Sequence, residues 1–444
     1  MRIRKVYKRI IAMVLAVNLS IGFQGAVYTT KAAATSQAGA VTIENTVTTT
    51  DQALELYKQG NVYYITPSTT PLKESALESY DAYNKKTMNY FTIRSYVEKF
   101  SEAGGGTLVL QKGKYELTNT IFVPSNVTIL LEDGVVLKKS MSTGTSKMNA
   151  VTSMFQLIST ENSKKKGYGK GYNGSKNINI IGLGSATIDL NYVKTSIAII
   201  MGHNSNVTIS GITFKNMNTG HFIEMDASQN VTVQYCSFSN VKKGSDYVKE
   251  AINIDTPDKE TEGFSSQWSS MDKTPNRNVT ISDCTFEKLG RAIGTHKYSA
   301  KKSKQMLHTN ITITNNTITN MYNDAPIRAM NWKNAVITNN TIDKVTCKTG
   351  GKVKKDTRGI LLSGTVNATV TLNKISNVGR AIQFIAWKNT GAGSSYPVIK
   401  DKLTNANKEA LAKNSVSKLG LKENFVRITY QYNKYDNAEK IEFN

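Results

Sequence analysis

Residues 206–214 read Asn-Val-Thr-Ile-Ser-Gly-Ile-Thr-Phe, and close variants of this nine-residue phrase occur six times up to residue 375. Each copy has Asn first, apolar residues second and fourth, and Phe or Ile ninth. The copies begin at Asn206, Asn230, Asn278, Asn310, Asn334 and Asn367. Because the shortest interval is 24 residues, the chain is predicted to repeat a coil of that length that accepts insertions.

The apolar positions of each copy alternate with polar ones, which predicts a β-strand. A second strand is predicted further along each coil, and its third residue is always Ile. These isoleucines are expected to point inward and stack: Ile223, Ile252, Ile293, Ile327, Ile360 and Ile382. The ninth residues of the phrase should stack likewise: Phe214, Phe238, Phe286, Ile318, Ile342 and Ile375. Two short strands per coil, with room for a third, predict an all-β fold, a parallel β-helix solenoid.

The seventh position of the phrase carries Asn in the last three copies, at Asn316, Asn340 and Asn373. If the coils stack at the strand spacing of about 4.8 Å, these side-chain amides form a ladder of hydrogen bonds. Cys236 and Cys284 occupy the same position in earlier copies. Stacked parallel side chains have poor geometry for a disulfide, so we expect buried free thiols there.

The N-terminal sequence is typical of a secretory signal peptide, predicted as residues 1–34. Five of the first nine residues are basic, an apolar run follows, and Ala-Ala-Ala stands at 32–34. The remaining predicted segments are an N-terminal extension (35–88), the β-helix (89–400) and a C-terminal cap (401–444), which contains a helix near 405–413 and a strand near 425–432. A helix through residues 96–101 is expected to cap the first coil, because a solenoid exposes its apolar interior at its ends.

The charge balance is strongly basic, at +23, and roughly +17 remains after the six basic residues of the signal peptide are removed. Such a field attracts acidic polysaccharide, teichoic acid or anionic lipid surfaces, although scattered lysines also simply keep a secreted protein soluble. Nucleic acid is disfavoured, because no motif of that class occurs. We therefore expect a secreted, extracellular monomer, with cell-wall association left open and no membrane span after signal cleavage.

The candidate chemistry comes from residues that face outward on the second strand. With the isoleucines in register, these residues form two columns. One column runs Ile200, Glu224, Asn253, Gly294, Arg328, Leu361, Gln383, and the other runs Gly202, Asp226, Asp255, His296, Met330, Ser363, Ile385. Polar groups concentrate in the middle of both columns, which indicates a site on about four consecutive coils.

Carboxylate spacing in these columns suits glycosidic bond cleavage. Glu224 and Asp226 are separated by roughly 6.5 Å along one strand face, which fits an inverting acid and base. Asp226 and Asp255 should stack at about 5 Å, which fits a retaining pair and should raise one pKa by repulsion. His296 could relay the proton, and Arg328 could bind a sugar carboxylate. The alternative is a solvated face with no chemistry.

Further residues are candidates for substrate contacts. His221 and Glu250 lie at the rim of the same coils, and Tyr298 and Trp332 could stack on sugar rings; Trp387 recurs in that register. The period is interrupted by insertions at 241–249, 256–277, 297–309 and 345–357, which carry Tyr247, Trp268, Tyr298 and lysines at 297, 301, 302 and 304. Loops raised on a rigid scaffold commonly form the walls of a site, so we expect these insertions to flank the columns.

Residues 89–137 resemble the entry of pectate-lyase-like β-helices, and residues 89–390 resemble the polygalacturonase family of right-handed β-helix glycoside hydrolases. The resemblance implies a right-handed helix with a substrate groove. The family motifs Asn-Thr-Asp, Asp-Asp, Gly-His-Gly and Arg-Ile-Lys are not matched verbatim. Arg328 falls on the family's Arg, whereas His221, Glu250 and Arg291 fall where the family has Asp, Asp and His. Analogy with β-helix carrageenases, which have a Glu-x-Asp strand motif, suggests Glu224, Asp226 and Asp255 instead.

Three functions remain open from the sequence. The first is a secreted glycoside hydrolase with Glu224, Asp226, Asp255, Glu250 and His296 as catalytic candidates and with His221, Arg328, Arg291, Tyr298, Trp332 and Asn253 as substrate-binding candidates. The second is a polysaccharide lyase or epimerase acting on uronates. The third is a non-catalytic glycan- or wall-binding surface protein. No cofactor is expected, because Gly104–Gly106 precedes a strand, and no metal site is expected, because no dense cluster of calcium ligands is present.

Overall fold

The computed structural model describes residues 47–72, 80–243, 249–259, 264, 266–296, 298–301, 304–349, 351–386, 400–431 and 437–444, all within the unit Ile43–Asn444. The predicted signal peptide and residues 35–46 of the extension lie outside the described residues. So do Tyr247, Trp387 and the lysines at 297 and 302.

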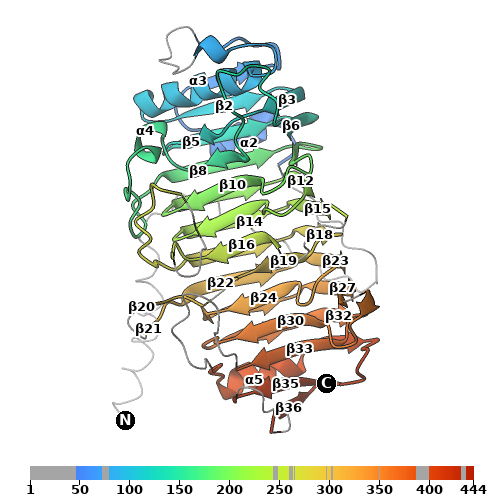
Figure 1. Ribbon diagram of the computed structural model, residues 1–444. Coiled ribbons are helices and arrows are strands. Elements are labelled where there is room, and N and C mark those ends of the chain that lie inside the picture. Colours follow the sequence, from blue (N-terminus) through green and yellow to red (C-terminus); the bar gives the residue numbers. More distant parts are fainter. Residues whose placement is uncertain are drawn as a thin grey trace, which may run out of the picture. The chain divides into compact units, whose positions relative to one another are not determined.

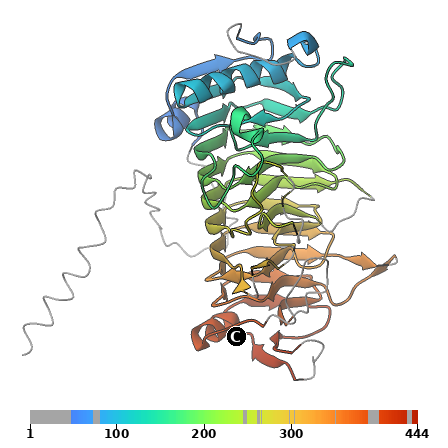
Figure 2. The same ribbon diagram turned by 60° about the vertical axis from the view of Figure 1, so that its left-hand side comes forward.

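The described chain forms three parallel sheets whose strands follow one another in each coil (Figures 1 and 2). Sheet A contains β1 (Val62–Ile65), β2 (Gly106–Leu110), β5 (Val127–Leu131), β8 (Lys176–Gly182), β11 (Ser205–Ser210), β14 (Gln229–Gln234), β17 (Arg277–Ser282), β22 (His308–Thr314), β25 (Trp332–Lys333), β26 (Val336–Thr338) and β31 (Thr369–Thr371). Sheet B contains β3 (Gly113–Leu117), β6 (Val135–Lys139), β9 (Thr187–Asp189), β12 (Thr213–Met217), β15 (Ser237–Val241), β18 (Thr285–Glu287), β23 (Thr317–Met321), β27 (Thr341–Val345), β32 (Lys374–Ser376) and β34 (Ser415–Ser417).

Sheet C carries the second predicted strand of each coil. It contains β4 (Ile121–Phe122), β7 (Ser153–Gln156), β10 (Ile197–Gly202), β13 (Ile223–Asp226), β16 (Glu250–Asp255), β19 (Arg291–Gly294), β24 (Ile327–Met330), β30 (Arg358–Ser363), β33 (Arg380–Ile385), β35 (Phe425–Thr429) and β36 (Glu439–Glu442). Its pairs are parallel except β35 with β36. The third strand, for which the sequence left room, is the sheet B strand that contains the ninth residue of the phrase. The predicted β-helix is confirmed.

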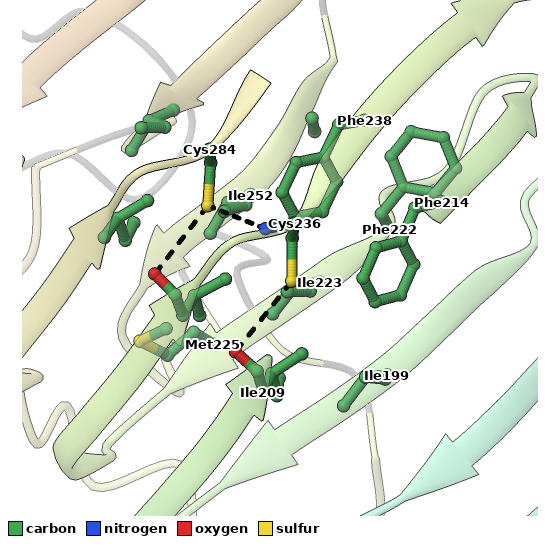
Figure 3. Packing of buried hydrophobic residues seen from close by; sticks show 14 of the residues in the cluster. Ile199, Ile209, Phe214, Phe222, Ile223, Met225, Cys236, Phe238, Ile252 and Cys284 are labelled. Atoms are coloured by element: carbon green, nitrogen blue, oxygen red, sulfur yellow. Dashed lines mark hydrogen bonds between the residues drawn. The ribbon is translucent and has the colours of Figure 1, made fainter. Parts of the chain in front are cut away.

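The interior is built from stacked identical side chains, as the repeat predicts. The six inward isoleucines are strand partners from Ile223 with Ile252 to Ile360 with Ile382. The rings of Phe214, Phe238 and Phe286 stack at 4.9 and 4.8 Å between centroids (Figure 3). All belong to one continuous apolar cluster, so each coil is stabilised by its neighbours rather than by a core of its own.

Two asparagine ladders run along the coils. The predicted inner ladder is confirmed: Asn316 donates to Asn340, Asn340 to Asn373, and Asn373 to Asn414, at 2.8–2.9 Å. The sequence analysis missed an outer ladder, made by the first Asn of each phrase and extended backwards by Asn177 and Asn126. These outer residues have φ between 52° and 60°, a left-handed conformation that Asn tolerates better than most residues. This backbone requirement explains why each phrase begins with Asn.

Helices and short hairpins complete the described structure. The remaining elements are α2 (Thr50–Tyr57), η1 (Tyr80–Ala82), α3 (Met88–Ala103), α4 (Thr160–Ser163), α5 (Asn405–Ala412), and the hairpins of β20 (Ala300–Lys301) with β21 (Lys304–Gln305) and β28 (Lys348–Thr349) with β29 (Lys352–Val353). Helix α3 contacts β2, β3 and β4 and adds Phe91, Val97 and Phe100 to the main cluster. Helix α5 and strand β35 match the C-terminal elements predicted near 405–413 and 425–432. Cys236 and Cys284 are buried free thiols, as expected.

Candidate functional site

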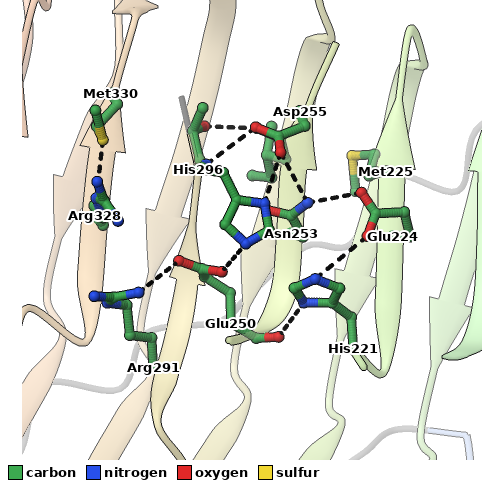
Figure 4. Close-up of polar contacts among 12 residues, drawn as sticks. His221, Glu224, Met225, Glu250, Asn253, Asp255, Arg291, His296, Arg328 and Met330 are labelled. Atoms are coloured by element: carbon green, nitrogen blue, oxygen red, sulfur yellow. Dashed lines mark hydrogen bonds and ion pairs between the residues drawn. The ribbon is translucent and has the colours of Figure 1, made fainter. Parts of the chain in front are cut away.

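The strand register of sheet C aligns the predicted columns. Ile200 pairs with Glu224, Glu224 with Asn253, and Asn253 with Gly294. The column then continues through Arg328, Leu361 and Gln383. In the second column Asp226 is the direct strand partner of Asp255. Strands β13 and β16 therefore bring the acidic candidates together on the face of sheet C that points away from the core, and Figure 4 shows Glu224, Glu250 and Asp255 among them.

Asn253 links two carboxyl groups in this cluster. Its Nδ2 donates to Glu224 Oε1 at 2.7 Å and to Asp255 Oδ2 at 3.1 Å. Two oxygens that share one donor are nearer to each other than the 6.5–9.5 Å separation typical of inverting glycosidases. The arrangement is therefore closer to that of a retaining pair. Asn253, predicted only as a substrate contact, organises the acids.

His296 lies between the carboxylates of Asp255 and Glu250. Its Nδ1 is 2.9 Å from Asp255 Oδ2, its Nε2 is 2.9 Å from Glu250 Oε2, and its backbone N–H donates to Asp255 Oδ1 at 3.1 Å. Burial lowers the pKa of His296, but Glu250 and Asp255 outweigh burial and raise this pKa to about 10. His296 is therefore a cation that neutralises part of a buried acidic pair.

His221, in contrast to His296, is neutral. Its Nδ1 lies 2.6 Å from the backbone carbonyl of Glu250, so this nitrogen carries the proton and donates it. Its Nε2 is then an acceptor, 3.5 Å from Glu224 Oε2. Burial, helped by the nearby His296, lowers the pKa of His221 to about 4. The two rings lie 5.3 Å apart, one neutral and one charged.

The four carboxyl groups separate into two pairs. Burial, reinforced by Asp255, raises the pKa of Glu224 to about 8. Burial, with repulsion from Glu224 and Asp255, raises the pKa of Asp226 well above its usual range. This is the direction expected from stacked carboxylates, although burial is the larger cause. Burial also opposes ionisation of Glu250 and Asp255, but His296 outweighs it and holds both pKa values low.

The cluster is covered rather than open, which corrects the expected groove. Asp226, Glu250, Asn253 and Asp255 are at most 1% exposed, and Glu224 is 6% exposed. Solvent reaches the group mainly at His296, whose side chain is 23% exposed.

The aromatic residues predicted to stack on sugar are also buried. Trp332 is fully buried, starts β25 of sheet A, and donates its Nε1–H to Thr295 Oγ1 at 2.9 Å. The chain has turned the corner from sheet C by this position, so the alternation that placed Trp332 outside no longer applies. Tyr298 is 2% exposed, and its hydroxyl contacts Ser363 Oγ. Neither ring is available to a ligand in this conformation.

The insertion at 256–277 packs on the sheet instead of standing beside it as a wall. Phe264 and Trp268 are buried against Ile200, and Trp268 Nε1 donates to Gln156 Oε1 at 3.0 Å. A Cβ atom added at Gly202 would lie 2.8 Å from the Phe264 ring, so this position needs glycine for the insertion to approach. The described part of this insertion therefore closes one side of the cluster.

The two arginines contact different partners. Arg291 Nη1 is 3.3 Å from Glu250 Oε1, and its Nε donates to the carbonyl of Asp324 at 3.0 Å. Arg328 lies on the next strand, where its Nε contacts Met330 Sδ (Figure 4). Burial and the nearby Arg291 lower the pKa of Arg328. Arg291 is thus part of the charge cluster, whereas Arg328 is beside it.

The sequence analysis missed one supporting residue, Asn276. Its Nδ2 donates to the backbone carbonyls of Asp255 and Met225 at 2.8 and 3.1 Å, and its Oδ1 accepts from the Ser228 N–H at 2.8 Å. Asn204 occupies the same place two residues before a phrase and bonds two carbonyls similarly. That recurrence is the signal that could have identified a corner residue holding the Asp255 strand end.

His221, Glu250 and His296 offer ligand atoms that all lie within 4.8 Å of one another. The cluster as a whole therefore contains groups able to donate a proton, groups able to accept one, and groups able to coordinate a cation. No described helix has the length and apolarity of a membrane span.

Comparison with known proteins supports the fold. Residues 264–425 match the family model described as a right handed beta helix region. A crystal structure of PfbA, a surface adhesin of Streptococcus pneumoniae, aligns with a TM-score of 0.54 and 20% identity over 80% of this chain and 79% of that one. The chain is a right-handed parallel β-helix.

Two further comparisons concern one curated protein and one solved structure. Plasmin and fibronectin-binding protein A of Streptococcus pneumoniae is 28% identical over 262 residues, which cover 54% of this chain and 35% of that protein. The chain thus spans about a third of the length of this curated relative. An iota-carrageenase from A. fortis aligns with a TM-score of 0.39 and 14% identity over 73% of this chain and 60% of that one.

Proposed function

We propose that the polar cluster of sheet C is the catalytic site of a secreted or surface-located glycoside hydrolase that cleaves a polysaccharide. The observation that carries this proposal is the Asn253 bridge between Glu224 and Asp255. Structural positions of this β-helix carry repeated apolar or amide side chains, whereas the adjacent strands β13 and β16 hold four carboxyl groups. His221, just before β13, and His296, just after β19, lie against them. Burying so many ionisable groups costs free energy of folding. Groups of this kind occur most often at functional sites, which favours a function here.

The geometry divides the roles. Asp255 accepts hydrogen bonds from Asn253 Nδ2 and from the backbone N–H and Nδ1 of His296. Because all three partners donate, Asp255 is the ionised nucleophile or base. Glu224 is the most exposed of the four carboxyl groups and faces His221, so it is the acid that protonates the leaving oxygen. Because the carboxyl groups are covered, substrate reaches them on the side of His296, the most exposed side chain of the cluster.

The test is release of reducing ends from a panel of neutral, uronate and sulfated polysaccharides. Glu224→Gln and Asp255→Asn should each lower the rate by at least about 10²-fold, and Glu287→Gln, a solvent-exposed acid on sheet B, should leave it unchanged. Wild-type rates in both site variants would remove the cluster from the chemistry. New reducing ends accompanied by products that absorb in the ultraviolet, as unsaturated uronates do, would instead indicate a lyase acting on uronates.

A second function is supported by a different observation, the similarity to plasmin and fibronectin-binding protein A. A chain of net charge +23 is also suited to hold acidic surfaces. We propose surface adhesion as the alternative, tested by measuring binding of the folded chain to immobilised fibronectin, plasmin and acidic glycans at increasing salt. Saturable binding with no product after long incubation favours adhesion. Absence of binding to all three excludes it for these ligands.

A further inference from the structure

We propose that His221, Glu250 and His296 form a binding site for a divalent transition-metal ion of the zinc type. The site goes beyond glycan cleavage, because it requires no substrate and would be present in an enzyme or in an adhesin. It also differs from the expectation from the sequence, which considered only oxygen ligands for calcium.

The ligand atoms are close enough for one ion. The three donor atoms lie within 4.8 Å of one another, and His296 Nε2 is 2.9 Å from Glu250 Oε2. Atoms that share a zinc ion at about 2.0–2.2 Å lie no more than about 4.2 Å apart. In tetrahedral geometry the donors lie about 3.4 Å apart, so a movement of about an ångström in the His221 ring completes the coordination. His221 lies just before β13, which begins at Ile223, and a rotation of its side chain supplies this movement.

Both rings are oriented as metal-ligating histidines are. His221 directs its Nδ1 to the backbone carbonyl of Glu250, and His296 directs its Nδ1 to the Asp255 carboxylate. The Nδ1 partner of each ring leaves its Nε2 available as a ligand, which is the outer-shell arrangement typical of histidine ligands. The Nε2 of His296 faces Glu250 Oε2, and the Nε2 of His221 faces Glu224 Oε2 (Figure 4). Asp255, His296 and the ion then form a carboxylate–histidine–metal series. Glu250 contributes twice, through its carbonyl to His221 and through its carboxylate to the ion.

An independent observation points to an occupant. Glu250 Oε2 and His296 Nε2 are buried, and within the described part of the chain neither has a partner in proper hydrogen-bond geometry, although they lie 2.9 Å apart. Their distance is that of an ion pair, but the N–H is not aimed along the line to the oxygen. Buried polar atoms without hydrogen-bond partners are where a ligand, a water or an ion binds.

The chemistry of the donors selects the class of metal. Two imidazole nitrogens and one carboxylate suit Zn²⁺, Co²⁺ or Ni²⁺ and not Ca²⁺ or Mg²⁺, which take oxygen ligands. Arg291 holds Glu250 Oε1 and so leaves Oε2 for the ion. Glu224 Oε2, 3.5 Å from His221 Nε2, borders the fourth position. The ion takes the place of the proton on His296 Nε2, and that proton is released to solvent.

The experiment titrates the tag-free, chelator-treated full-length protein with Zn²⁺ and Co²⁺ in the absence of any glycan. We expect one equivalent bound per chain by elemental analysis, a visible Co²⁺ spectrum of four-coordinate type, and a higher melting temperature with Zn²⁺ than with Mg²⁺ or Ca²⁺. Less than a tenth of an equivalent at 100 µM Zn²⁺ in the wild-type chain would overturn the proposal without reference to any variant.

Variants locate the site. His221→Gln and His296→Gln should each weaken Zn²⁺ binding by at least 100-fold, and Asp255→Asn by about 10–100-fold through loss of the outer-shell contact. His203→Gln is the matched control, because His203 is buried one coil away and contacts Ser269 and Gly171 instead. Equal binding in wild type, His221→Gln and His296→Gln would place the ion elsewhere. Because binding is measured without substrate, failure of glycan cleavage and failure of metal binding are separate results.

Discussion

Two polar stacks in this chain are built by the same coil register and differ in every other respect. The inner ladder, Asn316, Asn340, Asn373 and Asn414, repeats one neutral side chain that both donates and accepts. The sheet C cluster changes residue type at each strand and contains buried acids, a protonated histidine and a neutral one. Repetition of one self-satisfying group stabilises a solenoid, whereas departure from repetition at adjacent strands marks a site adapted for chemistry or binding.

The largest effect should follow from removing one charge from the cluster. Glu250→Gln leaves His296 and Arg291 without their shared carboxylate, and breaking a buried ion pair costs about 3–5 kcal/mol. Unfolding by guanidinium chloride at pH 7, with chelator present, measures this loss. Glu224→Gln is the matched comparison, because an amide replaces a carboxyl group that burial already keeps protonated; we expect a cost below about 1 kcal/mol. Equal costs would mean that the cluster is not organised by charge.

The inner ladder should be almost as sensitive, but for a different reason. Asn340 is fully buried, accepts from Asn316 Nδ2 and backbone N–H, and donates to Asn373 Oδ1 and to the Ile313 carbonyl. Asn340→Ala leaves several buried groups unpaired at about 1–3 kcal/mol each, so we expect a loss of about 3 kcal/mol. The loss should not vary between pH 5 and 8, because no member titrates. A marked pH dependence would contradict the distinction between the two stacks.

A buried acid elsewhere shows what a carboxyl group does without a histidine. Asp401 accepts from Thr365 N–H and Oγ1–H at 2.8 and 2.6 Å, and burial raises its pKa to about 7. The folded chain then binds more protons than the unfolded chain between pH 4 and 7, so stability falls as pH rises through that window. We expect a loss of roughly 2 kcal/mol from pH 5 to pH 8, measured by denaturant unfolding. Glu224 and Asp226, whose pKa values burial also raises, add to the measured slope, so Asp401→Asn should reduce the pH dependence by about 2 kcal/mol, the part assigned to Asp401, and leave the rest; an unchanged slope would assign all of it to other groups.

The repeat predicts the register of the fold but not the environment of each side chain. Inward isoleucines recur at fixed spacing, so the partners Ile223 with Ile252 and Asp226 with Asp255 follow from pattern alone. Burial of the acids depends on insertions that have no period, and Phe264 and Trp268 show how one insertion packs on the sheet. Trp332 was misplaced because alternation stops at a coil corner. The cluster's membership was therefore predictable, while its exposure and charge states were not.

The smallest effect should come from the outer ladder, and it decides why each phrase begins with Asn. Asn310 donates to Asn278 Oδ1 at 2.9 Å and accepts from Asn334 Nδ2 at 3.3 Å, but it is solvent-exposed and has φ of 57°. Asn310→Gly keeps this left-handed conformation without strain and loses only exposed hydrogen bonds, so we expect a cost below about 1 kcal/mol. Asn310→Val should cost more than Asn310→Gly, because a β-branched residue is strained at positive φ. If glycine cost as much as Asn340→Ala, the outer amides would stabilise the solenoid as the inner ones do, and the repeated Asn would be selected for its hydrogen bonds rather than for its backbone.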